Sequence, residues 1–92
     1  MPSIFCVGGY RIYFWSNENN EPIHVHISKG KPSSGATKVW LTSKGRCVLA
    51  NNNSRISAKE LNELLDVVSA HFFLICSEWK KHFLVEDIRF YC

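Results

Sequence analysis

Close cysteine pairs and long apolar runs are missing from this 92-residue chain. The cysteines stand at Cys6, Cys47, Cys76 and Cys92, and none forms the C-x-x-C spacing of a zinc knuckle. The longest apolar-rich stretch, VVSAHFFLIC, is too short for a membrane-spanning helix, so we expect no membrane partner. The first residues lack the basic segment and apolar run of a secretory signal, which predicts a cytoplasmic chain with reduced thiols.

A strong charge of either sign is missing as well. The formal net charge is +3 and the isoelectric point about 8.8. This mild excess of positive charge is compatible with a nucleic acid or an acidic protein as partner but requires neither. Hydrophobic residues at 46% and charged residues at 21% are typical of a globular chain and exclude a disordered one. The length favours a single domain over residues 1–92.

What the chain does contain is a run of segments in which apolar and polar side chains alternate. This period of two predicts four short strands. We expect them over residues 9–16, 23–28, 37–42 and 46–50. The breaks between them, NENNEP, SKGKPSSG and TSKG, are rich in turn-forming residues, and such short connections favour an antiparallel meander.

A helix is predicted to follow over residues 57–81. Ser57 and Glu60 have the spacing of a capping box, and Ile56 and Leu61 have that of a hydrophobic staple. Apolar residues then continue at helical spacing, and a helix of this length would be roughly 36 Å long. The sequence therefore predicts one long helix that crosses the sheet.

The middle of that helix is apolar on more than one side. Val67, Phe73 and Leu74 need a second cover, which we expect from a partner chain or from the C-terminal tail. The tail alternates as a strand would, and this favours a fifth strand over residues 85–91. The predicted fold is therefore α+β, a four-stranded antiparallel meander extended by this fifth strand, with one long helix packed on one face.

Strand alternation also assigns residues to the two faces of the sheet, because successive side chains point to opposite sides. The helix-covered face should carry Ile12, Phe14, Ile23, Val25, Ile27, Val39, Leu41, Cys47 and Leu49. The second face should carry His24 and His26 among aromatic rings and cations. Rings stack on bases and cations neutralise phosphates, but the same residue types also anchor protein partners. The candidate residues for binding nucleic acid or a partner are Arg11, Tyr13, Trp15, Glu18, Trp40 and Arg46.

The segment NEPIHVHISKG raises the question of what His24 and His26 do. Imidazoles are common metal ligands, but a metal site needs further ligands. The sequence nearby offers Lys29 and Lys31 instead, and cations are poor neighbours for a metal ion. We therefore expect neither a metal nor a cofactor.

Two further interpretations of the pair stay open. As an acid–base pair, one imidazole would accept a proton and the other donate one, while a nearby cation stabilises a pentavalent phosphate. This catalytic hypothesis rests on His24, His26, Lys38 and Arg55. In the structural interpretation, the rings hydrogen-bond to neighbours such as Glu18 or Glu21, or contact a partner.

Several motifs taken together carry a family resemblance. The stretch GGYRIYFWSNENNEPIHVHISKG, then ATKVWL, then EWKKHF after the long helix, resembles the small bacterial family known as domain of unknown function 4160. The likeness spans residues 8 to about 83 and rests mainly on the spacing of S-N-E, E-P and H-V-H. In many members proline directly precedes the first histidine, whereas Ile23 intervenes here. This chain also continues into LVEDIRFYC, which shorter members lack.

The resemblance implies a toxin component of a bacterial toxin–antitoxin pair, neutralised by a small antitoxin protein that is encoded nearby. We hypothesise a ribonuclease-like toxin that acts on RNA or on translation through its His-x-His surface. The alternative is a non-enzymatic module of such a pair that binds protein or DNA. The incompletely covered apolar surface is also compatible with a homo-oligomer.

Overall fold

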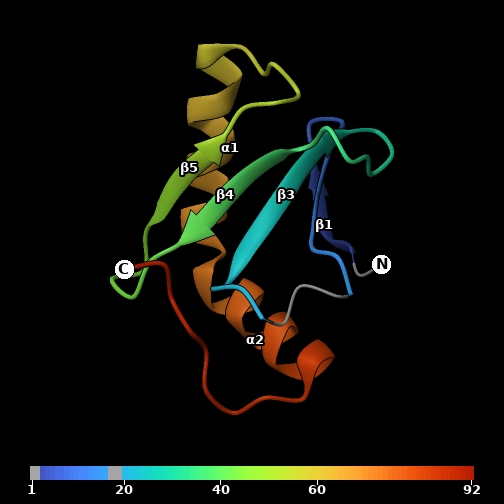
Figure 1. Ribbon diagram of the computed structural model, residues 1–92. Coiled ribbons are helices and arrows are strands. Elements are labelled where there is room, and N and C mark those ends of the chain that lie inside the picture. Colours follow the sequence, from blue (N-terminus) through green and yellow to red (C-terminus); the bar gives the residue numbers. More distant parts are fainter. Residues whose placement is uncertain (1–2, 17–19) are drawn as a thin grey trace.

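The computed structural model describes residues 3–16 and 20–92. They form an α+β fold with an antiparallel sheet of five strands in the order β1-β2-β3-β4-β5 (Figure 1). The strands are β1 (Ser3–Val7), β2 (Tyr10–Tyr13), β3 (His24–Lys29), β4 (Thr37–Leu41) and β5 (Cys47–Asn51). Each strand pairs with the next along the chain, so the predicted antiparallel meander is confirmed.

The sequence prediction missed the first strand. β1 and β2 form a hairpin across Gly8 and Gly9, which have φ of 55° and 84°. Positive φ at both central residues is the conformation that suits a two-residue hairpin turn, and glycine adopts it without strain. The apolar residues of β1 do not alternate with polar ones, so period-two patterning does not mark this strand.

The predicted single helix over 57–81 is in fact two helices, α1 (Ala58–Ala70) and α2 (Phe72–Phe83). Ser57 caps α1 as expected, since its side chain accepts a hydrogen bond from the Glu60 amide. The break falls at His71, whose φ of −105° and ψ of 23° are not helical. The His71 imidazole contacts Val67 O at 2.8 Å and packs against Phe5, with ring centroids 4.6 Å apart. The change of direction carries α2 past the start of β3 (Figure 1).

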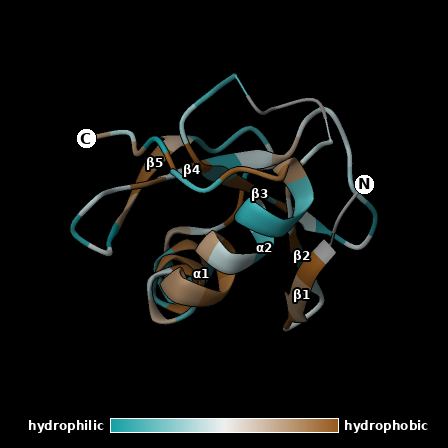
Figure 2. Ribbon diagram, turned by 90° about the horizontal axis from the view of Figure 1, so that it is seen from below, coloured by the Kyte–Doolittle hydropathy of each residue, from teal (hydrophilic) through white to brown (hydrophobic). Residues whose placement is uncertain are grey.

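The hydrophobic core lies between the sheet and the two helices, which cover the same side of β3 and β4 (Figure 2). The residues predicted to face inward on and beside β2, β3 and β4 belong to one buried core cluster with residues of α1 and α2, and this supports the assignment of faces for these strands. Cys47 also faces α1, because its Sγ lies 3.4 Å from Leu65 O. Leu49 remains 37% exposed because β5 is an edge strand. Among the described residues, no helix is both long and apolar enough to cross a membrane.

The C-terminal tail does not form the predicted fifth strand. It runs as an extended segment that contacts the residue just before β3 and the last residue of β4, with hydrogen bonds from Ile23 N to Arg89 O (2.8 Å) and from Tyr91 N to Leu41 O (3.1 Å). Bonds to separate strands do not build a ladder, which explains why the alternation gave a wrong prediction here. The tail covers part of α2, where Phe90 stacks on Phe72, but Phe73 stays 84% exposed.

Candidate functional site

The sheet has an open face, opposite α1, where side chains of β2, β3 and β4 form a row. Tyr13 lies directly across from His26, and His26 lies directly across from Lys38. Residues opposite each other in an antiparallel pair project from the same face and come into contact. His24 and Trp40 form the next pair along these strands. The predicted clustering of the histidines with aromatic rings and a lysine is therefore present.

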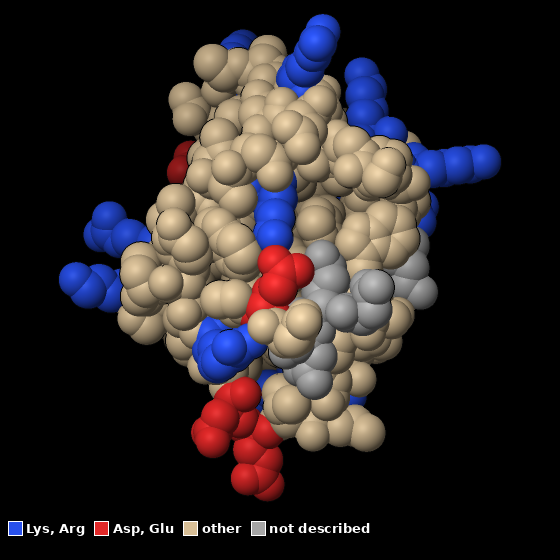
Figure 3. Space-filling model, viewed as in Figure 1, with Lys and Arg blue, Asp and Glu red and all other residues tan. Residues whose placement is uncertain are grey.

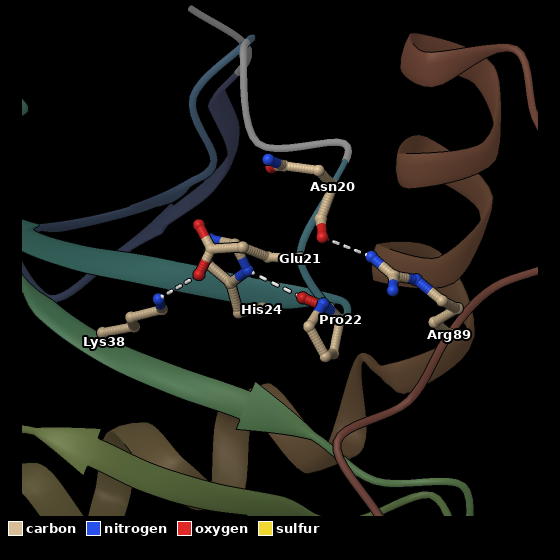
Figure 4. Close-up of polar contacts among 6 residues, drawn as sticks. All are labelled: Asn20, Glu21, Pro22, His24, Lys38 and Arg89. Carbon is tan, nitrogen blue, oxygen red and sulfur yellow. Dashed lines mark hydrogen bonds and ion pairs between the residues drawn. The ribbon is translucent and has the colours of Figure 1, made fainter.

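His24 is fully buried within this cluster. Its Nδ1 lies 2.9 Å from Pro22 O, and a hydrogen bond to that carbonyl requires the proton on Nδ1 (Figure 4). Its ring meets the Trp40 indole nearly edge-on, with centroids 5.4 Å apart, and it meets Trp79 of α2 at 5.5 Å. The imidazole is thus held on several sides and does not reach a ligand at the surface.

His26 is only partly buried, so it is the more accessible of the two histidines. Its ring centroid lies 5.0 Å from that of His24, 5.6 Å from that of Tyr13 and 6.4 Å from that of Trp15. The surrounding rings restrict how the imidazole can turn. A group that is both positioned and accessible suits proton transfer or hydrogen bonding to a bound molecule.

Lys38 supplies the positive charge closest to the histidines in the register of the sheet. Its Nζ lies 4.2 Å from the Trp40 ring centroid and 2.7 Å from Glu21 Oε1. Figure 3 shows this face with a basic side chain against an acidic one near its centre and further cations toward its rim. Glu21, one of the two neighbours expected to contact the histidines, forms an ion pair with Lys38.

The other candidate residues are placed in different ways. Tyr13 is fully buried, and its hydroxyl hydrogen-bonds to Ser28 Oγ at 2.9 Å. Arg11 lies on the same face, opposite Ser28. Arg46 is exposed in the turn before β5. Glu18 falls outside the described residues.

Arg55, one of the proposed catalytic cations, belongs to the connection between β5 and α1. That connection lies at the opposite end of the sheet from the start of β3 (Figure 1). Its neighbours Asn52 and Ser54 hydrogen-bond to the Thr37 hydroxyl, which lies on the helix side. This position gives no support for a catalytic role of Arg55 beside the histidines.

Trp40 has a neighbour that the sequence did not reveal. Tyr91, in the tail, stacks on it with ring centroids 5.0 Å apart and an angle of 12° between the planes. The Arg89 guanidinium helps to fix the tail by donating to Asn20 O (Figure 4). The alternation of the tail was the only sequence signal for this segment, and it does not specify which strand the tail meets.

A second cluster outside the open face joins Tyr10 to α1. The Tyr10 hydroxyl donates to Glu60 Oε2 at 2.5 Å. This hydrogen bond to a carboxylate raises the pKa of Tyr10 above its ordinary value, and burial and the charge of Glu60 add to the effect. The two residues line a cavity of about 200 Å³ together with Glu63, Leu64 and Val67. Sequence reasoning did not identify this pair.

The thiols of Cys47 and Cys76 are partly buried, and burial raises the pKa of each. A raised pKa favours the thiol over the nucleophilic thiolate, which agrees with their interpretation as small core residues. Within residues 3–16 and 20–92, no group of three histidine, cysteine, aspartate or glutamate side chains is arranged to hold a metal ion.

Comparison with known proteins places the chain in a family. A search of curated proteins and a search of solved structures each gave no match. The family described as Domain of unknown function (DUF4160) matches residues 9–80, a segment that contains β2 to β5, α1 and most of α2. The match includes the whole His-x-His strand and ends before the C-terminal tail. This protein therefore belongs to the DUF4160 family.

Proposed function

We propose that this protein is the toxin component of a bacterial toxin–antitoxin pair and acts in the cytoplasm on RNA or on the translation apparatus. The observation that carries this proposal is the open face, where Trp15, His26, Lys38 and Trp40 lie on and beside adjacent strands. Indole rings stack on unpaired bases, and a lysine attracts the phosphates between them. The resemblance in the S-N-E, E-P and H-V-H motifs supports the toxin setting.

Within this proposal the two histidines have different roles. His26 is the accessible group that exchanges a proton or a hydrogen bond with the bound RNA. Lys38 stabilises negative charge on a phosphate. The phosphate must compete with Glu21, which pairs with the Lys38 ammonium group in the free protein. His24 is a positioning residue, because its buried ring contacts that of His26 at 5.0 Å.

Growth of cells after induction of the protein tests this function. The wild type should stop growth, while His26→Ala and Lys38→Ala should allow it at equal amounts of soluble protein. His82→Ala and Lys81→Ala are matched controls on α2 and should stop growth as the wild type does. Co-expression of the neighbouring small protein should restore growth. If His26→Ala and Lys38→Ala arrest growth as fully as the wild type, the open face is not the working surface.

The burial of His24 favours a second candidate function, a non-enzymatic module that binds a protein or DNA within such a pair. A two-histidine acid–base mechanism needs both imidazoles at the substrate, and His24 is 0% exposed. In this case the purified protein should bind the neighbouring protein tightly and leave labelled RNA intact over hours. RNA cleavage that disappears in His26→Ala would exclude the module.

A further inference from the structure

The end of the C-terminal tail covers part of the open face beside Trp40. The Tyr91 ring lies nearly parallel to the Trp40 indole, and Tyr91 is still 49% exposed. The stack therefore forms at the surface and not in the core. A flat ring stacked on a surface tryptophan has the geometry of a base on a platform that binds single strands.

The residue after Tyr91 is held by the turn between β4 and β5. The Ser43 amide and the Ser43 hydroxyl both donate to Cys92 O, each at 2.9 Å. Lys44 and Arg46 follow in the same turn, and both are exposed. Backbone amides, hydroxyls and cations are the groups that proteins use to hold phosphate oxygens. The turn thus offers phosphate-binding groups next to an aromatic platform.

A cavity of about 410 Å³ lies at this turn, and its volume falls within the range of small-molecule sites. It is lined by Thr42, Lys44, Arg46, Cys47, Val48 and Cys92. Val48 lies directly across from Trp40 in the sheet, so the cavity adjoins the platform. The ring, the donors and the cations therefore belong to one continuous surface.

We propose that Trp40, Ser43, Lys44 and Arg46 form a nucleotide subsite for single-stranded RNA, which Tyr91 and Cys92 occupy in the free protein. This deepens the proposed function, on which the choice of RNA as ligand rests. Tyr91 takes the place of a base on Trp40, and Cys92 O takes the place of a phosphate oxygen at Ser43. The tail lies beyond the segment that matches the family, residues 9–80, and RNA must displace it to bind.

Fluorescence anisotropy of a labelled short oligouridine tests the subsite. Tyr91→Ala removes the competing ring and should bind several-fold more tightly than the wild type, whereas Tyr91→Phe keeps the ring and should bind as the wild type does. Lys44→Ala combined with Arg46→Ala should weaken binding about tenfold and reduce its dependence on salt. Lys80→Ala combined with Lys81→Ala removes the same charge from α2 and should leave binding unchanged.

These substitutions lie at exposed positions, and circular dichroism checks that each variant folds. Equal affinity of Tyr91→Ala and Tyr91→Phe, or unchanged affinity without Lys44 and Arg46, overturns the subsite. Binding of polyglutamate in place of oligouridine also overturns it and assigns the turn to an acidic protein segment. Growth arrest without any oligouridine binding refutes the subsite alone. Binding as predicted without growth arrest supports the subsite and refutes the toxin function.

Discussion

The imidazole of His24 packs against the indole of Trp79, with ring centroids 5.5 Å apart and an angle of 66° between the planes. Trp79 also contacts Phe14 in the core, at 5.0 Å. The first histidine of the His-x-His motif is therefore continuous with the hydrophobic core, although it projects from the opposite face of β3. The two histidines therefore have different roles. His24 supports the fold, whereas His26 remains accessible.

The first prediction concerns the stability of the two histidine variants. His24→Ala should lower the free energy of unfolding by about 2–3 kcal/mol, because it leaves a cavity among three rings. His26→Ala should lower it by about 1 kcal/mol or less, since its ring is only partly buried. Urea denaturation followed by tryptophan fluorescence measures both. Equal losses would show that His24 is not part of the core.

The second prediction is a dependence of stability on alkaline pH. The pKa of Tyr10 is raised in the folded state, chiefly by its hydrogen bond to Glu60. The neutral phenol is thus favoured by folding, so this contribution is complete below the unfolded pKa of about 10 and is lost as the pH rises through the folded pKa. The free-energy difference between wild type and Tyr10→Phe should shrink above pH 10. A difference that stays constant in urea titrations up to pH 11 would contradict it.

The third prediction concerns the reactivity of the cysteines. Burial raises the pKa of Cys47, and its Sγ lies 3.3 Å from Ser69 Oγ, whereas Cys6 is exposed. Iodoacetamide at pH 8 should therefore alkylate Cys6 well before Cys47, because the thiolate is the reactive form. Peptide mass spectrometry over a time course measures each site. Comparable rates would mean that Cys47 is not enclosed between β5 and α1.

The fourth prediction concerns the end of α2. Leu84 has a φ of 54° and is 90% exposed, so it adopts a left-handed conformation without gaining from burial. Leu84→Gly should raise the free energy of unfolding by about 0.5–1 kcal/mol, since glycine adopts this conformation without strain. Leu74→Gly, inside α2, is the matched control and should lower stability by about 1 kcal/mol or more. A loss of stability in Leu84→Gly would show that the tail depends on the leucine side chain.

The faces of the sheet could be predicted from the sequence because the signal is local. Val25 and Ile27 alternate with His24 and His26. Because successive side chains of a strand point to opposite faces, this alternation assigns the two pairs to different faces of the sheet. The degree of burial on the open face could not be predicted in the same way. His24 is buried by Trp79, which lies far along the chain and reaches it only because α2 changes direction.

The break at His71 and the contacts of the tail could not be predicted from the sequence, because they too depend on residues far apart in the chain. His71 is flanked by residues that continue the helical stripe, with no proline or glycine to end a helix there. Its contact with Phe5 depends on β1, which the patterning did not identify. Likewise, the stack of Tyr91 on Trp40 joins segments that no local rule connects.

Protein synthesis in a cell-free translation reaction tests the central claim most directly. Purified wild-type protein should reduce the incorporation of labelled amino acids, and adding the neighbouring small protein should restore it. His26→Ala and Lys38→Ala should have little effect, while His82→Ala should inhibit as the wild type does. Undiminished synthesis with folded wild-type protein, or full inhibition by His26→Ala and Lys38→Ala, would contradict an action on RNA or translation through the open face.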